Sequence, residues 1–436
     1  MLAIRFRQLT NQSVSEAAGR QFMKTRVRAL YILLLMLAAM SLTNCSPYSC
    51  RVTFGSSTCT PSGSGVTGTG GNGGGGGGGG GGGTTISAAN ATTLVYFVDA
   101  AGVEGTGFGG TTFAPLTGYT VPALPSNAAD NMAIVNKQFV YIPMGDTTIQ
   151  AFSLTRATGL LTAVAGSPFS VSGTTGTADG AWSDPQGRFL FVGTEVGGFI
   201  WVFQINSTTG VLTETVGSPF TTGISSADIM TVDASGKFLY VGQGSASAGV
   251  AGFLIDQTTG ALTPITGSPF NLSVAQIHAS LTGEFLLGVA EIQDAGGGVN
   301  ATDPHIYVYA INSVTGVPTA ATGSPFATTM VPFDFAISPN GKYVYTVGTG
   351  VALSTADPIE GFSMDTTTGA LTALSGSPFT SLPTPTQCQF DQAGVTLVCR
   401  DSGSSEMSVL TASPTTGALT HTADLTSGGS PFAITD

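Results

Sequence analysis

The sequence predicts an all-β fold: a seven-bladed β-propeller of four-stranded antiparallel blades, with a C-terminal strand that closes the N-terminal blade. The first observation is a repeat. The motif Gly-Ser-Pro-Phe recurs with its glycine at positions 166, 217, 267, 323 and 376, so the copies lie 50 to 56 residues apart. A period near fifty is typical of propellers and solenoids. The second is composition, because 62 glycines and only 9% charged residues favour short strands joined by many turns.

Each copy contains a tight turn followed by a strand that is apolar at successive positions. A glycine in the turn supplies the positive φ that the turn needs. A strand that is apolar on both faces is buried on both faces, as a mid-blade strand is between neighbouring blades. We expect seven such strands, at residues 93–97, 138–142, 189–192, 238–241, 284–287, 343–345 and 395–398.

A further strand precedes each Thr-Gly turn, and a Leu-Thr pair after the turn begins the outer strand. Each copy is therefore a four-stranded antiparallel meander. The predicted third strands are residues 149–154, 200–205, 250–255, 306–311, 359–364 and 407–412.

The two ends of the repeat region complete each other. The first copy has no sequence before it for an innermost strand, whereas the last residues, Gly429–Asp436, match the segment 331–337 that begins the sixth copy. We expect the C-terminal segment to complete the N-terminal blade, because closure removes the open edges of the sheet array.

The N-terminal 44 residues predict a signal peptide. A basic segment begins at Met23, which is a possible true start, and residues 29–40 form an apolar core too short for a comfortable membrane span. The segment Leu42-Thr43-Asn44-Cys45 resembles a bacterial lipoprotein box, so we expect lipidation of Cys45, although Asn44 departs from the usual small residue. Simple secretion and an N-terminal membrane anchor are the alternatives.

Residues 45–90 are rich in Ser, Thr and Gly and predict a disordered tether, followed by the propeller at 91–436. An exported chain meets an oxidising compartment, where four cysteines besides Cys45 allow three pairings. Cys388 and Cys399 flank a turn symmetrically, so we favour their pairing, with Cys50 bonded to Cys59. Buried free thiols are the alternative.

Without the leader, seven basic and twenty-four acidic residues remain. A strongly acidic surface repels nucleic acid and anionic lipid headgroups. We therefore expect no nucleic-acid partner and membrane contact through the N-terminal lipid alone. The expected partner of this monomeric propeller is an unknown protein or carbohydrate.

The turn and strand at 338–347, with the wider pattern Thr-Gly-x-Leu-Thr…Ser-Pro-Phe, resemble the YVTN-repeat, lactonase-like propeller family, which includes 6-phosphogluconolactonases. The resemblance covers roughly residues 91–436 and implies the propeller fold. It also implies an Arg-His pair seven to eight residues before a turn glycine, and a Glu eight residues after it.

This sequence departs from that site pattern. Glu291 stands eight residues after Gly283, but the Arg-His slots before Gly283 hold Ala275 and Gln276. Glu195 likewise follows Gly187, where the slots hold Asp179 and Gly180. The missing pair argues against lactone hydrolysis, and the scarcity of cations argues against a phosphosugar lactone as substrate.

His278 and Glu291 are the candidate catalytic residues, as a general base and its orienter. The alternative for His278 is a strand histidine bonded to backbone. His305 and His421 have no neighbours of metal-ligand type at useful spacing, and no cofactor is expected. Trp182 and Trp201 are the two tryptophans, and each either stacks on a sugar or packs in the core.

Four carboxylates fall near the starts of innermost strands and could form an acidic rim around the axis that binds a cation or a polyol. A Gly-rich insertion in the fifth copy offers Asp294, Asn300 and Asp303 as possible Ca²⁺ ligands. Solvated loop carboxylates are the alternative in both cases. The rim residues are Asp130, Asp179, Asp228 and Asp334.

The sequence thus predicts an exported propeller, either an outer-membrane or cell-surface lipoprotein or a periplasmic or secreted protein. Its expected role is a binding or scaffold module at the bacterial cell envelope. The alternative is a lactonase-like hydrolase of sugar lactones, and a second alternative is a surface adhesin.

Overall fold

The fold comes from a computed structural model that describes residues 85–110, 112–124, 131–173, 176–242, 249–290, 303–350, 359–381, 385–401, 406–425 and 429–436. The predicted leader, Cys45 and the tether up to residue 84 lie outside the described residues. Within the described part, no helix is long and apolar enough to cross a membrane.

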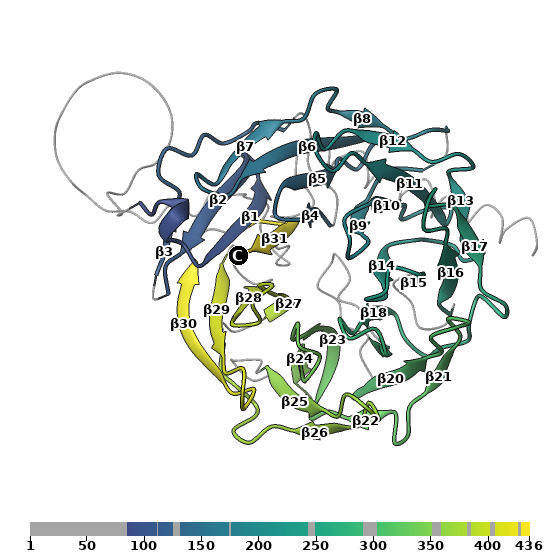
Figure 1. Cartoon of the computed structure of the whole chain (residues 1–436). Helices are drawn as coiled ribbons and strands as arrows, with labels where there is room; N and C mark the ends of the chain where they lie inside the picture. The colour runs from purple at the N-terminus through teal and green to yellow at the C-terminus, as the bar shows by residue number, and fades with distance from the viewer. Residues whose placement is uncertain are drawn as a thin grey trace, which may run out of the picture. The chain divides into compact units, whose positions relative to one another are not determined.

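Seven antiparallel sheets form the blades of a propeller (Figure 1), which confirms the predicted fold class. Each sheet runs from an inner strand through a second and a third strand to an outer one. From blade one to blade seven, the inner strands are β31 (Phe432–Thr435), β4 (Ala133–Val135), β9 (Gly180–Ser183), β14 (Ile229–Val232), β18 (Gln276–Ala279), β23 (Met330–Ile337) and β27 (Pro385–Phe390).

The second strands are the predicted apolar segments. In the same blade order they are β1 (Thr93–Asp99), β5 (Phe139–Pro143), β10 (Phe189–Gly193), β15 (Phe238–Gly242), β19 (Phe285–Val289), β24 (Tyr343–Gly350) and β28 (Thr396–Asp401). The third strands are β2 (Gly102–Phe108), β6 (Thr148–Thr155), β11 (Phe199–Ile205), β16 (Ala251–Ile255), β20 (His305–Ile311), β25 (Glu360–Met364) and β29 (Met407–Ala412).

The outer strands are short. They are β3 (Phe113–Pro115), β7 (Leu160–Ala163), β12 (Leu212–Glu214), β17 (Leu262–Pro264), β21 (Pro318–Ala320), β26 (Leu371–Ala373) and β30 (Leu419–Leu425). Three blades add a two-residue strand that pairs with the third strand, namely β8 (Phe169–Ser170), β13 (Phe220–Thr221) and β22 (Phe326–Ala327).

The predicted closure is confirmed. β31 pairs antiparallel with β1 and completes the first blade, with Val95 opposite Ile434 and Phe97 opposite Phe432. β31 also contacts β4 of the second blade and β27 of the seventh, so the ring is continuous. At the end of the same segment, Lys137 forms an ion pair with Asp436 at 2.9 Å.

Each neighbouring pair of blades encloses its own hydrophobic core, which explains the uninterrupted apolar strands. Successive residues of a second strand serve opposite sides: Leu190 and Val192 of β10 pack toward blade two, whereas Phe189 and Phe191 pack toward blade four. Burial on both faces removes most of the apolar surface of these strands from water, which is the main driving force of folding.

The Gly-Ser-Pro-Phe motif is hydrogen-bonded to the third strand of its blade. In each of the five internal copies, the serine hydroxyl oxygen accepts a hydrogen bond of 2.9 to 3.2 Å from a backbone amide of that strand. The following Ser–Pro peptide bond is cis in all of them and at Ser430–Pro431. The motif therefore recurs because five of the seven blades use the same bond.

The Thr-Gly turn joins one blade to the preceding one. The hydroxyl of a second-strand tyrosine donates to the carbonyl oxygen of the turn glycine in the next blade at 2.6 to 2.8 Å. The glycines have positive φ, and a Cβ at Gly210 would lie 2.4 Å from the ring of Phe139. Only glycine fits there. The pairs are Tyr96–Gly159, Tyr141–Gly210, Tyr240–Gly316 and Tyr345–Gly417.

The folded part begins earlier than predicted. Ile86 pairs with Leu116, and the 3-10 helix η1 (Ala88–Asn90) buries Ala88. Arg156 of blade two donates hydrogen bonds to the carbonyl oxygens of Ala88 and Ala91. Residues 86–90 therefore belong to the propeller, not to the predicted tether.

The two ends of the blades differ in charge. We call the end that carries the turns between inner and second strands the turn end, and the opposite end, with the links between blades, the loop end. Five of the six basic residues after residue 84 lie at the turn end, namely Lys137, Arg156, Arg188, Lys237 and Lys342. The described loop end holds Arg400 and the acidic residues Asp99, Asp146, Asp179, Glu195, Asp228, Asp303, Glu360, Asp401 and Glu406.

Candidate functional site around the propeller axis

Three inner strands bring polar side chains together at the axis. Asp334 of β23 is buried and accepts a hydrogen bond from the side-chain amide of Gln276, on β18, at 3.0 Å. Its other carboxylate oxygen accepts the backbone N–H of Cys388, on β27, at 3.2 Å. Blades five, six and seven thus share one carboxylate.

His278 lies beside this carboxylate. Its Nε2 is 3.6 Å from Asp334 Oδ1 and 3.3 Å from the amide nitrogen of Gln276. The edge of its ring meets the face of Phe335, with ring centres 4.9 Å apart and an angle of 87° between the planes. The His278 side chain is 40% exposed, so it is oriented by protein on one side and open to solvent on the other.

A β-bulge places Asp334 in this position. β23 pairs regularly with β24 except between Pro332 and Asp334, where the register shifts. A bulge inserts one residue and re-aims the side chains that follow it. Asp334, which was predicted to lie on the acidic rim, therefore lies within β23 and contacts His278.

The other predicted rim residues do not join this cluster in the described structure. Asp179, in the link before β9, accepts hydrogen bonds from the Thr177 hydroxyl and from the backbone amide of Glu195 at 2.7 Å. Burial raises the pKa of the Asp179 carboxyl, and the Glu195 amide opposes that rise. Asp228 precedes β14 in blade four, and Asp130 lies outside the described residues.

Asp303, one of the predicted Ca²⁺ ligands, contacts two side chains of its own blade. Its two carboxylate oxygens bind the ring nitrogen Nδ1 of His305 at 2.5 Å and the Tyr307 hydroxyl at 2.7 Å. Burial, together with this hydrogen bond to Asp303, raises the pKa of Tyr307 to about 12. His305 therefore does have a carboxylate neighbour, contrary to the sequence prediction, and so does His421, whose Nε2 is 2.7 Å from Asp424.

The remaining predicted Ca²⁺ ligands, Asp294 and Asn300, lie outside the described residues, as does Glu291, the predicted orienter of His278. Among the residues that the structure describes, no group of three or more His, Cys, Asp or Glu side chains could hold a metal ion.

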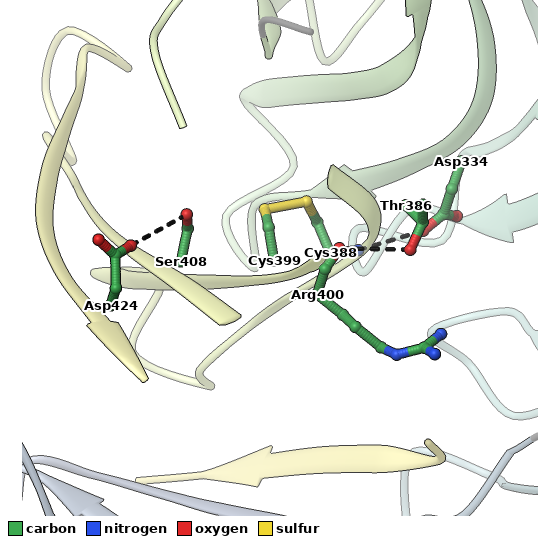
Figure 2. Close-up of a disulfide and its surroundings, with 7 residues drawn as sticks. All are labelled: Asp334, Thr386, Cys388, Cys399, Arg400, Ser408 and Asp424. Carbon is green, nitrogen blue, oxygen red and sulfur yellow. Dashed lines mark hydrogen bonds between the residues drawn. A yellow bond between two sulfur atoms is a disulfide. The ribbon is translucent and has the colours of Figure 1, made fainter. Parts of the chain in front are cut away.

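The pairing of Cys388 with Cys399 is present, and the two residues lie opposite each other on β27 and β28. Figure 2 shows this disulfide next to Asp334, and the side chain of Arg400 is directed away from the disulfide. Cys388 forms the disulfide and also donates its backbone N–H to a carboxylate oxygen of Asp334. The disulfide therefore fixes one of the groups that hold the axial carboxylate.

Sequence reasoning missed Gln276 and the pairing of His278 with Asp334. Gln276 occupies a slot where the family carries part of its Arg-His pair, and only that mismatch drew attention to it. The signal available was its spacing, because residues two apart in a strand share a face. Asp334 is more than fifty residues from His278 in sequence, so no local pattern joins them.

Comparisons with known proteins agree with this architecture. The model of the lactonase seven-bladed β-propeller family matches residues 136–272 and 310–435. The chain belongs to that family. No curated protein matches the sequence.

Solved structures share the fold at low sequence identity. A provisional 6-phosphogluconolactonase from Bacteroides uniformis is 16% identical, with 78% of this chain and 98% of that chain covered and a TM-score of 0.60. A second, from Bacteroides fragilis, is 16% identical over 81% and 100%, with a TM-score of 0.59. The periplasmic gluconolactonase of Pseudomonas aeruginosa is 13% identical over 78% and 98%, with a TM-score of 0.57.

Proposed function

We propose that this protein hydrolyses an uncharged sugar lactone at the propeller axis, with His278 as the general base. Membership of the lactonase family favours this function over the scaffold role that the sequence alone suggested. The observation that carries it is the contact between exposed His278 and buried Asp334. A histidine held by a carboxylate is a recurrent general base in hydrolysis.

The proposed chemistry requires the tautomer of His278 that carries its proton on Nε2, the nitrogen on the side of Asp334. With the proton on Nε2, the lone pair of Nδ1 takes a proton from water as its oxygen attacks the lactone carbonyl carbon. The tetrahedral intermediate then breaks the ring C–O bond, and the imidazolium returns its proton to the departing ring oxygen. The product is an open-chain hydroxy acid, and the Asp334 carboxylate stabilises the transient imidazolium.

Charge favours an uncharged substrate over a phosphorylated one. A phosphate needs fixed cations, and five of the six basic residues after residue 84 lie at the turn end. Arg188 is bonded to Asp184, and Lys137 to Asp436. The periplasmic gluconolactonase is a structural neighbour whose name specifies a lactone without phosphate.

Acid release from D-glucono-1,5-lactone, corrected for spontaneous hydrolysis, tests the proposal. We expect His278→Ala to lower kcat/KM by about 10²- to 10⁴-fold, and Asp334→Asn to lower it to a lesser degree. His421→Ala is the matched control, because His421 also contacts a carboxylate but lies on β30, the outer strand of blade seven. Equal activity of His278→Ala and the wild type would exclude His278 as the base.

A non-catalytic binding propeller is the second candidate. The missing Arg-His pair favours it, because the residues in those slots are Ala275 and Gln276 before Gly283. Absence of turnover on a panel of sugar lactones, together with a ligand retained by the purified protein, would support binding over hydrolysis.

We further propose export with lipidation at Cys45, on the strength of the apolar leader and the lipoprotein-like box. In cells, Cys45→Ser should move the protein from the membrane fraction to the soluble one. A wild-type protein already found in the soluble fraction would contradict the lipid anchor.

A further inference from the structure

The two tryptophans of the chain occupy different environments. Trp201, on β11, is 1% exposed, and its indole N–H donates to the carbonyl oxygen of Ser172 at 2.8 Å. Trp182 lies on the inner strand β9 and is half-buried. Trp201 is a buried core residue, whereas Trp182 packs against the core between blades three and four and leaves part of its side chain in solvent.

The indole of Trp182 lies over Gly180, on the same face of β9. A Cβ added to Gly180 would be 2.3 Å from Cη2 and 2.6 Å from Cζ3 of the indole. Gly180 is not among the glycines with positive φ, so the backbone does not require glycine here. The missing side chain instead leaves room for the six-membered ring of Trp182.

The register of the inner strands places this ring level with the axial cluster. Trp182 stands two residues before the buried turn residue Asp184, and His278 stands two residues before the equivalent Ser280. Gly180 is correspondingly equivalent to Gln276. The indole of Trp182 covers Gly180, so it reaches the same level along its inner strand as Gln276 does in blade five. Gln276 is the residue that binds Asp334.

We propose that Trp182 is the stacking platform for the sugar-lactone ring, a residue that sets affinity for the substrate of the proposed hydrolysis. A pyranose-like lactone has an apolar C–H face and a polar edge. Aromatic faces pack against such apolar surfaces, while a few placed polar groups fix orientation. Trp182 receives the C–H face, and the side-chain amide of Gln276 donates a hydrogen bond to the polar edge. This inference rests on the proposed function.

Fluorescence tests the platform directly, because the chain has only two tryptophans. The probe is D-gluconolactam, an uncharged ring analogue that carries an amide in place of the ester. In Trp201→Phe, where Trp182 is the sole tryptophan, the lactam should change the emission saturably. In Trp182→Phe, where Trp201 is the sole tryptophan, it should not.

Affinity measured by calorimetry gives the second readout. Trp182→Ala should weaken lactam binding and raise KM by about tenfold with a smaller change in kcat, whereas Trp182→Phe retains a ring and most of the affinity. Gly180→Ala, which displaces the indole, should weaken binding in the same direction. Thermal melting of each variant separates loss of binding from loss of fold, and Gly180→Ala is the comparison if Trp182→Ala melts early.

The outcomes separate this inference from the proposed function. Turnover of gluconolactone with an unchanged KM in a folded Trp182→Ala would overturn the platform and leave the lactonase intact. A lactam-dependent change in Trp182 emission in a protein without turnover would support the platform and reject the hydrolysis. His278→Ala should bind the lactam nearly as well as the wild type while losing turnover.

Discussion

The turn end of the blades and the strands around the axis follow opposite rules. At the turn end, equivalent positions hold Asp184, Asp233, Ser280, Ser338 and Asp391, all buried and all accepting backbone amides of the strand that follows. Two residues earlier, on the inner strands, equivalent positions hold Trp182, Thr231, His278, Ala336 and Gln389. The same kind of residue recurs at the turn that builds each blade, whereas the residue two positions earlier on the inner strand differs from blade to blade. The unequal positions are therefore where chemistry is to be sought.

The largest expected effect on stability comes from opening the ring of blades. Deleting Ser430–Asp436 removes β31, including Phe432 and Ile434, both buried between blades one and seven. Loss of two buried apolar side chains and of the pairing with β1 should cost at least about 5 kcal/mol. Thermal melting measures it, with Lys137→Ala as the control because that half-exposed ion pair is worth below about 1 kcal/mol. An unchanged melting temperature for the truncation would contradict closure by β31.

The disulfide, which belongs to the axial region, should give the next largest change in stability. Replacing Cys388 and Cys399 with Ser opens a loop with a sequence separation of 11 residues, and should lower the free energy of unfolding by about 3 kcal/mol. Reductant should lower the melting temperature of the wild type but leave that of the double variant unchanged. Equal sensitivity of both proteins to reductant would show that this disulfide does not stabilise the fold.

A smaller effect tests the turn end. Asp233 accepts the backbone amides of Lys237 and Phe238 at 2.8 and 2.7 Å and is buried, so Asp233→Ala should cost about 2 kcal/mol. Asp256 also accepts two backbone amides, but it is exposed in a Thr-Gly turn. Asp256→Ala should lower the melting temperature less. The reverse order would mean that burial does not set the strength of these caps.

The smallest expected effect depends on pH and concerns Asp179, beside the axis. Because burial raises its pKa, the folded state holds the proton more tightly than the unfolded chain, so stability declines as pH rises from the unfolded pKa of about 3.9 through the folded one. Asp179→Asn lacks this decline. Its melting temperature relative to the wild type should therefore rise as the pH increases above about 4. A difference that stays constant or falls would contradict the raised pKa.

The sequence predicted the architecture because blade construction is local and repeated. A turn glycine, a serine that binds the third strand and an apolar second strand lie within one copy, so each copy reports the same structure. Closure was predictable for the same reason, since Phe432–Ile434 has the same sequence as Phe335–Ile337 at the end of β23. The boundary at residue 91 was wrong because Ile86 and Ala88 pack through single contacts without a periodic pattern.

The site was only partly predictable because it is assembled across blades. His278 was identified from its place in an inner strand, but its partner Asp334 depends on the β-bulge at Pro332–Asp334, which no spacing rule reveals. Asp303 looked like a cation ligand in a Gly-rich loop, yet it binds His305 and Tyr307 on its own strand. Whether a carboxylate meets solvent or a neighbouring side chain is decided by three-dimensional packing.

The bonds from second-strand tyrosines to turn glycines have an evolutionary consequence. Each joins one copy to the following copy through equivalent positions, so the donor in any copy matches the acceptor in every other. Recombination that duplicates or excises a module at matching points would recreate the joint between the new neighbours. Phe191, which has no hydroxyl at the equivalent position, shows that a joint also tolerates the loss of its donor. The number of blades is then limited more by the geometry of the closed ring than by the contacts between neighbouring blades.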